Sequence, residues 1–216
     1  MIASKNNSIT ILVHGFNKNK NDMFYLENGL NKYGFKTFSV NLPTTFGTFE
    51  ECRNSFYLQI NDFIKDYNSV NYVAHSMGGL IVRDYIEYTN QHNVDKCIFI
   101  ATPHNGSKLA EIATFIPFYK NIFKSINALL PNNKLSYKNL NIRIGLIVGD
   151  KNKGILGKLF LSKDSDGLVE TSSVKTIDAN EVIILHFGHK EIHQQYETLI
   201  YVKQFLTTAT FVTIKK

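Results

Sequence analysis

The stretch VNYVAHSMGG (Val70–Gly79) joins an apolar run to the helical pattern of residues 80–86. A serine at such a junction is typical of a nucleophile elbow, in which a strained backbone lifts the hydroxyl above a sheet. The residues two before and two after Ser76 must then be small, and Ala74 and Gly78 meet that demand. Glycine is usual at the first of these positions, but the methyl group of alanine is small enough to replace it. The alternative is a serine that only caps a helix, so other segments have to decide between the two.

Apolar, β-branched runs alternate along the chain with amphipathic stretches, which predicts repeated crossovers between parallel strands. The runs are residues 9–13, 37–40, 70–74, 97–101, 142–148 and 182–185, and helical spacing appears in residues 22–33, 49–67 and 77–88. The pattern predicts an α/β protein with a doubly wound, mostly parallel sheet of about six strands and flanking helices. Ligands of such sheets bind beyond the carboxyl ends of the strands, and Ser76 follows one of those ends.

Length and composition predict one domain over residues 1–216, because the chain is 44% hydrophobic and has no run of 18 apolar residues. Cys52 and Cys97 lie too far apart to suggest a disulfide framework. The net charge of +6 comes from dispersed lysines without a block of like charge, so we expect no nucleic-acid partner. The pattern favours a solvated lysine-rich surface, and the alternative is a positive field that attracts anionic substrates or allows transient contact with a lipid surface. Residues 1–7 lack the apolar stretch of a secretory signal, so we expect a cytoplasmic protein. The oligomeric state is not indicated.

The segment His14-Gly15-Phe16 directly follows the first predicted strand. In a serine hydrolase this position supplies one backbone N–H to the oxyanion hole, and the residue after the nucleophile supplies the other. We therefore assign the two donors to Phe16 and Met77. We place His14 and His75 in the substrate pocket, with His14 in a structural role rather than as a proton carrier.

A serine nucleophile needs a histidine base and an acid that orients it, in the chain order serine, acid, histidine. The first choice for the acid is Asp166, because the run Ser165–Glu170 can turn a carboxylate toward the site after the strand that ends at residue 148. Asp150 and Asp164 remain alternatives.

Three histidines compete for the role of base. His189 lies on the loop just beyond the last predicted strand and is the first choice, while His193 and His186 stay open. His92 and His104 precede the acid and fail the order test. The candidate ligands form no compact cluster of histidine, cysteine and carboxylate at metal spacing, so we expect no metal and no organic cofactor.

An aromatic-rich segment from Glu111 to Pro131 predicts two short amphipathic helices. Within an insertion over residues 105–140 they would form a small helical cap whose Phe115 and Phe118 contact substrate, or they would pack as ordinary helices against the sheet. Residues 154–161 are expected to form a second rim of the same pocket. Residues 209–214 alternate like an edge strand.

From residue 9 to residue 205 the chain resembles small bacterial lipases and esterases of the α/β-hydrolase superfamily. The resemblance rests on His14-Gly15-Phe16, Ala74–Gly79, Thr102–Ser107, Asp166–Val169 and Gly188-His189. It implies an α/β-hydrolase fold in which Ser76 is the nucleophile, Asp166 the acid and His189 the base, with Thr102–Ser107 shaping the pocket. Glu170 departs from the proline that many relatives have there.

These observations predict a hydrolase that cleaves a small-molecule ester or lipid substrate through an acyl-enzyme intermediate. An acyltransferase or thioesterase would use the same residues with another acceptor or leaving group. A binding protein of a different class would keep the pocket without catalysis, although the presence of all three triad residue types argues against it.

Overall fold

A single parallel sheet organises the computed structural model, which describes residues 7–89, 91, 93–131 and 142–212. Its strands are β1 (Ser8–Val13), β2 (Thr37–Ser39), β3 (Ser69–His75), β4 (Val94–Ile100), β5 (Arg143–Gly149) and β6 (Glu181–Leu185). They run in the order β2-β1-β3-β4-β5-β6, and every neighbouring pair is parallel. The six predicted parallel strands are therefore confirmed, each within a few residues of its predicted bounds.

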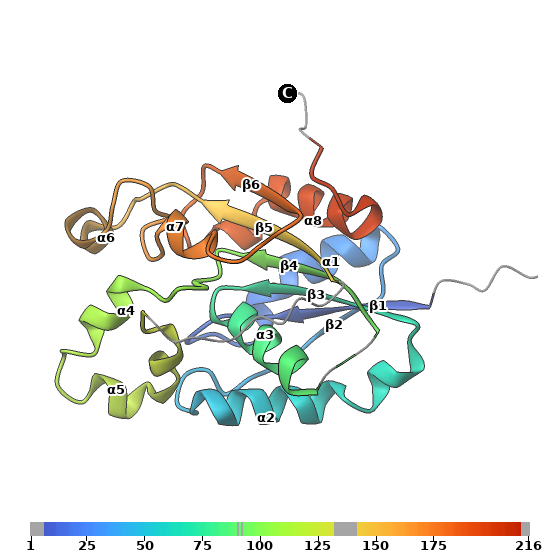
Figure 1. Cartoon of the computed structure of the whole chain (residues 1–216), viewed down its shortest axis with the longest axis horizontal. Helices are drawn as coiled ribbons and strands as arrows, with labels where there is room; N and C mark the ends of the chain where they lie inside the picture. The colour runs from blue at the N-terminus through green and yellow to red at the C-terminus, as the bar shows by residue number, and fades with distance from the viewer. Residues whose placement is uncertain (1–6, 90, 92, 132–141, 213–216) are drawn as a thin grey trace, which may run out of the picture.

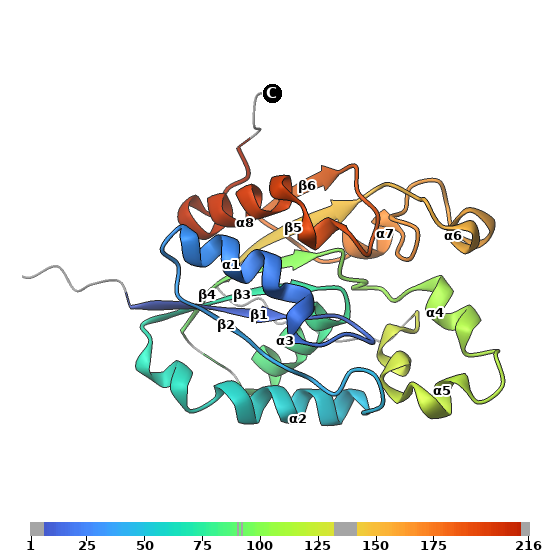
Figure 2. The same ribbon diagram turned by 180° about the vertical axis from the view of Figure 1, so that it is seen from behind.

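Helices cover both faces of the sheet, as crossovers between parallel strands require. One face carries α2 (Phe49–Ile60), the 3-10 turn η2 (Phe63–Asp66) and α3 (Met77–Thr89), and the other carries η1 (Lys20–Met23), α1 (Phe24–Lys32), η4 (Ile192–Gln194) and α8 (Tyr196–Thr208). Figures 1 and 2 show the two layers from opposite sides. The helical patterns of residues 22–33 and 49–67 each divide into an α-helix and a 3-10 turn. The predicted α/β class, a doubly wound parallel sheet with flanking helices, is confirmed.

The register of the central strands brings three loops together at the carboxyl edge. Val13 of β1 pairs with Ala74 of β3, and His75 of β3 pairs with Ile100 of β4. These strands consequently end at the same level, and the loops that follow them leave the sheet side by side.

Short helices project from this same edge of the sheet (Figure 1). They are α4 (Lys108–Ala113), α5 (Tyr119–Ile122), η3 (Lys124–Leu129), α6 (Ile155–Phe160) and α7 (Thr171–Val174). The two predicted helices of residues 111–131 are three shorter ones, of which η3 is largely buried and packs against α2 and α3. Part of the predicted cap insertion, residues 132–141, lies outside the described residues.

The predicted edge strand at residues 209–214 is wrong for its described part, residues 209–212. The chain leaves α8 through Ala209, whose φ of 59° is left-handed, and Phe211 then packs on Phe205 and Tyr201 with ring centroids 5.0 and 5.9 Å away. The apolar side chain therefore covers the end of a helix instead of joining the sheet. No described helix is both long enough and apolar enough to span a membrane.

Candidate active site

The turn after β3 holds Ser76 in a strained backbone conformation with φ of 53°. Residues other than glycine seldom adopt this left-handed conformation. Its N–H donates to the carbonyl of Ile100 at 2.9 Å, which ties the turn to β4. A Cβ at Gly78 would lie 2.6 Å from the carbonyl oxygens of both Val13 and His14. The small residue expected at this position is therefore required by the backbone that passes beneath the elbow.

A chain of hydrogen bonds links the serine to a histidine and a carboxylate. Nε2 of His189 lies 2.9 Å from Oγ of Ser76, and Nδ1 of His189 lies 2.7 Å from Oδ2 of Asp166. Because an ionised carboxylate only accepts, Nδ1 carries the proton and Nε2 is left to accept from the hydroxyl. The other carboxylate oxygen of Asp166 accepts the N–H groups of Leu168 and Val169 at 3.0 and 2.7 Å. All three side chains are largely buried, and low exposure strengthens such hydrogen bonds.

The alternative acids and bases lie in other contacts. His186 is exposed and pairs with Asp150 at 2.9 Å, while His193 lies 3.0 Å from the carboxylate of Asp22. Asp164 is exposed, and its backbone carbonyl accepts the hydroxyl of Ser162. The structure thus brings Ser76, His189 and Asp166 together. The other candidate acids and bases take no part in this chain of hydrogen bonds.

Two backbone N–H groups lie beside the serine. Phe16 follows β1 in the loop that approaches the elbow so closely that a Cβ at Gly15 would lie 3.0 Å from Cβ of Ser76. Met77 is the first residue of α3. Among the contacts of the described residues, neither the N–H of Phe16 nor that of Met77 donates to a protein acceptor. Both donors are therefore free to bind an oxygen atom brought by a ligand.

A cavity of about 520 Å³ opens above Ser76 and His189. Its wall is mostly apolar and includes Phe16, Leu109, Ala113, Tyr119, Ile126, Leu129 and Leu168, together with Pro103 and Ser107. An adjoining hollow of about 430 Å³ is lined by Ile155 and Leu156 of α6. The second rim expected from residues 154–161 borders this hollow rather than the main cavity. Tyr119, Ile126 and Leu129 belong to the segment predicted to cap the pocket, but sequence patterns could not tell which of its apolar residues face the cavity, because such a residue looks like any core residue.

Three residues assigned to the substrate pocket from sequence do not line the cavity. His14 is fully buried, and its Nε2 accepts the N–H of Leu42 at 3.0 Å while Nδ1 faces the carbonyl of Gly15. Burial also lowers the pKa of His14, so the ring is neutral and braces two loops. Phe115 and Phe118 are 80% and 76% exposed, because the turn that carries them projects from the protein surface. The structure thus places all three residues outside the lining of the cavity.

His75 borders the cavity, yet its polar atoms face the protein. Its Nε2 lies 3.0 Å from the carbonyl oxygen of His189, and its ring stacks on that of His193 with centroids 3.9 Å apart.

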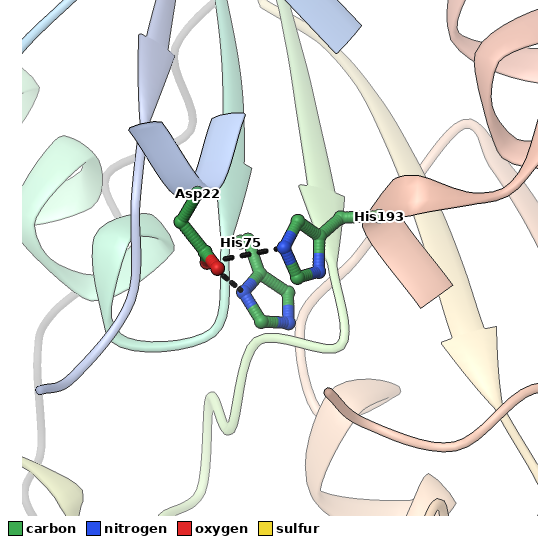
Figure 3. A group of neighbouring side chains, drawn as sticks. All are labelled: Asp22, His75 and His193. Carbon is green, nitrogen blue, oxygen red and sulfur yellow. Dashed lines mark ion pairs between the residues drawn. The ribbon is translucent and has the colours of Figure 1, made fainter. Parts of the chain in front are cut away.

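Asp22, His75 and His193 form a buried cluster in which one ligand-type atom of each residue lies within 4.8 Å of the others (Figure 3). Among the described residues this is the one group of three histidine, cysteine or acidic side chains that could hold a metal ion. Its members are remote in sequence, so no spacing rule could have found it.

Comparison with known proteins identifies a family. A family model described as "Putative serine esterase (DUF676)" matches residues 3–142. Triacylglycerol lipase 2 of Saccharomyces cerevisiae is 32% identical over 98 residues, which cover 42% of this chain and only 28% of the yeast protein.

Solved structures extend the comparison to nearly the whole chain. The mature form of lipase BlEst2 from Bacillus licheniformis has a TM-score of 0.76 at 17% identity, covering 96% of this chain and 94% of that one. Phospholipase PlaB from Legionella pneumophila has a TM-score of 0.69 at 16% identity, covering 95% of this chain and 60% of that one. At these identities the similarity shows a shared fold.

Proposed function

The chain belongs to the DUF676 family of serine esterases, and from this premise we propose that it hydrolyses carboxylic esters through Ser76, His189 and Asp166. The predicted enzyme class, a carboxylic ester hydrolase, agrees with that family. The observation that carries the proposal is the unbroken chain of hydrogen bonds from the Asp166 carboxylate through His189 to the Ser76 hydroxyl. Nucleophile, base and orienting acid are the three parts that acyl transfer by serine requires.

The first half of the reaction forms an acyl-enzyme. Oγ of Ser76 attacks the ester carbonyl while its proton passes to Nε2 of His189, and the Asp166 carboxylate stabilises the resulting imidazolium. The N–H groups of Phe16 and Met77 donate to the oxyanion of the tetrahedral intermediate, where each donor contributes about 100- to 1,000-fold in rate. His189 then returns the proton to the departing alkoxide.

Water completes the cycle. A water molecule gives its proton to His189 and attacks the acyl carbon, and collapse of the second tetrahedral intermediate releases the carboxylic acid and restores the Ser76 hydroxyl. Asp166 keeps its orientation throughout, because two backbone N–H groups hold the oxygen that does not contact His189.

The acyl group is assigned to the apolar cavity above Ser76, whose volume of about 520 Å³ falls in the range of small-molecule sites. The names of the yeast, Bacillus and Legionella proteins point to lipid esters, and we propose the same substrate class for this chain. Beside the cavity, Phe115, Phe118, Ile155 and Leu159 are all at least 70% exposed. We propose that these side chains contact the surface of an aggregated lipid, since large apolar side chains lie exposed on α6 and on the turn after α4, and α4 and α6 are in contact.

The catalytic assignment is tested with p-nitrophenyl esters from acetyl to palmitoyl. Ser76→Ala should lose at least about 10⁴-fold in kcat, and His189→Ala should fall to a similar level, because the two groups act as a unit. Activity that survives in Ser76→Ala would refute the proposal. A folded wild type that cleaves none of the esters would refute ester hydrolysis and redirect the search to thioesters, other acyl acceptors or a binding role.

The surface assignment is tested separately with the double variant Phe115→Ser/Phe118→Ser. Hydrolysis of a soluble butyryl ester should be unchanged, because neither ring lines the cavity, while hydrolysis of an emulsified long-chain ester should fall. The variant Tyr33→Ser is a matched control, since Tyr33 is an exposed aromatic residue on the far end of α1. Equal losses on both esters would contradict the assignment.

A further inference from the structure

A buried cluster that ester hydrolysis does not use lies directly behind the proposed base. Asp22 comes from η1, His75 from the last position of β3 and His193 from η4, and the side chains are 6%, 3% and 0% exposed. Burying three such groups costs free energy unless hydrogen bonds or opposite charges pair them, and each of them has partners in a specific arrangement. The arrangement involves the loop that carries His189.

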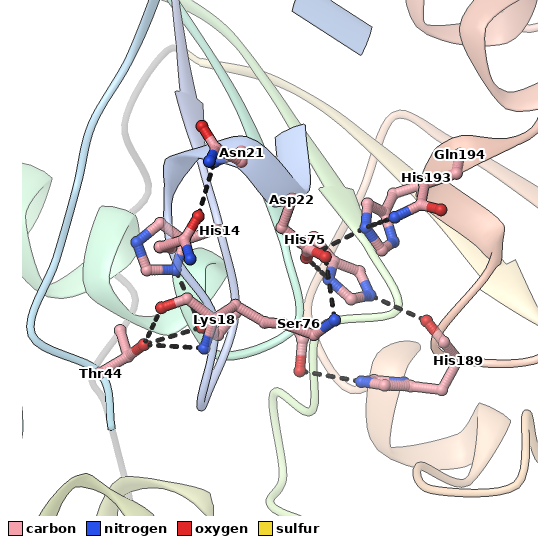
Figure 4. A network of polar contacts seen from close by, with 12 residues as sticks. His14, Lys18, Asn21, Asp22, Thr44, His75, Ser76, His189, His193 and Gln194 are labelled. Carbon is pink, nitrogen blue, oxygen red and sulfur yellow. Dashed lines mark hydrogen bonds and ion pairs between the residues drawn. The ribbon is translucent and has the colours of Figure 1, made fainter. Parts of the chain in front are cut away.

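The backbone of His189 is held by Asp166 on one side and by His75 on the other. Its N–H donates to the carbonyl of Asp166 at 2.9 Å, and its carbonyl faces Nε2 of His75 at 3.0 Å (Figure 4). A carbonyl only accepts, so Nε2 of His75 is the donor. His75 immediately precedes Ser76, so this one hydrogen bond ties the peptide of the base to the elbow of the nucleophile.

The other two members of the cluster hold the ring of His75. His193 stacks on it at 3.9 Å with planes 24° apart, and Nε2 of His193 lies 3.0 Å from Oδ2 of Asp22. Lys18 contacts the second oxygen of Asp22 at 3.0 Å. Burial raises the pKa of Asp22, but contact with His193 and Lys18 outweighs it, so the pKa lies below its ordinary value and the carboxylate is charged. Burial holds the pKa of His75 well below its ordinary value, which leaves a neutral ring with one proton to place.

The geometry of the cluster does not suit a metal ion. Both imidazoles direct a nitrogen at the same carboxylate, and their planes lie nearly parallel (Figure 3). Imidazoles that share a metal instead converge on a point between them, about 2.0 Å from each nitrogen. Here the rings are stacked 24° from parallel, and His193 Nε2 and His75 Nδ1 lie 3.0 and 3.9 Å from one oxygen of Asp22. This arrangement favours pairing of His193 with the carboxylate over a shared ion.

We propose that His75 is a positioning residue that sets the reach of His189 Nε2 to Ser76 Oγ, and that Asp22 and His193 hold the His75 ring for this task. The inference rests on the proposed function, because it assigns His189 as the base. Its consequence is that the residue before the nucleophile controls the rate of proton transfer and not the binding of substrate.

The experiment compares His75→Leu with His75→Gln on the butyryl ester and measures the rate of labelling by a fluorophosphonate. His75→Leu should lower kcat and the labelling rate by about 10- to 100-fold, since a misplacement of about 1 Å can cost 100-fold, while KM stays within about 2-fold. His75→Gln should restore most of both rates, because the glutamine amide can donate to the same carbonyl. His193→Phe keeps an aromatic ring on His75 and should lose less activity than His193→Leu.

The matched control is His186→Leu, which removes an exposed histidine near the end of β6 and should leave all rates unchanged. Unchanged kcat in His75→Leu would overturn the inference, as would a loss confined to KM or a Gln variant no better than Leu at equal melting temperature. A rise in melting temperature on adding Zn²⁺ alone, absent in His193→Phe, would overturn it in favour of a metal site. Ser76→Ala in the same series separates the cases, because activity surviving there refutes the proposed function itself.

Discussion

Replacing Gly78 by alanine tests how closely the elbow is packed against the strand beneath it. The new Cβ would lie 2.6 Å from the carbonyl oxygens of Val13 and His14, whereas ordinary contacts begin near 3.4 Å. Both obstacles are backbone atoms, so no side-chain rotation relieves the overlap. The elbow and the segment that leads to Phe16 must separate by about 0.8 Å, the difference between 3.4 and 2.6 Å.

The displacement affects both stability and rate. Overpacking of this kind costs about 1–3 kcal/mol, and for a chain of this length each kcal/mol lowers the melting temperature by about 2–4 °C. The expected fall is therefore about 2–12 °C. Because Ser76, Met77 and Phe16 all lie on the segments that move apart, kcat should fall by about 10- to 100-fold.

The assay combines thermal unfolding with kcat on the butyryl ester, measured at a temperature where the variant is folded. Gly154→Ala is the matched control, since a Cβ there would meet its nearest atom at 3.7 Å and the residue has φ of −80°. That control should melt at or slightly above the wild-type temperature. A Gly78→Ala variant with the stability and kcat of wild type would refute the argument from packing.

Three further predictions concern the acid, pH and the thiols. Asp166→Asn should lower kcat by about 10⁴-fold, the loss known for the corresponding change in a serine protease triad, while Asp150→Asn should change it less than about 2-fold; equal effects would contradict the assignment of the acid. Burial, assisted by Arg83, holds the pKa of His104 well below its usual value near 6.5, so the unfolded chain takes up the proton first and stability falls as pH drops below about 6.5. Melting temperatures from pH 7 to pH 5 should decline less steeply in His104→Gln than in wild type, and parallel curves would speak against this source. Burial raises the pKa of Cys52 to about 12 and that of Cys97 further, so iodoacetamide at pH 8 should label neither in the native protein and both after unfolding, as counted by mass spectrometry.

Local patterns were sufficient for the fold because the four central strands β1, β3, β4 and β5 are buried on both faces. Each strand must then be a short apolar run, and each crossover helix shows one apolar stripe, so all six strands and the main helices could be located from residue spacing alone. The tail was predicted wrongly, since the alternation of residues 209–214 is the same whether Phe211 joins a sheet or covers a helix. Periodicity does not distinguish a side chain's partners.

The site was predictable only in part. Steric demands at the elbow are local, and they pointed to Ser76 from its immediate neighbours. The exposed position of Phe115 and Phe118, outside the cavity lining, could not be predicted, because aromatic residues in a short helical segment suit a pocket wall and an exposed ridge equally well. The exposed side of such a segment is decided by its packing on the rest of the protein, here by η3 against α2.

Sequence alone was enough to predict the order of the catalytic residue types along the chain. A serine comes first, then an acid, then a histidine, each after a strand. Sequence alone left three aspartates and three histidines in competition, because the partners are 113 and 23 residues apart and no local rule measures such distances. Only the tertiary structure brought His189 to Ser76 and Asp166, paired His186 with Asp150, and placed His193 with Asp22 behind the base. Hydrogen bonds are decided over about 3 Å in space, and the parallel register that aligns the carboxyl ends of the strands sets which residues come within that reach.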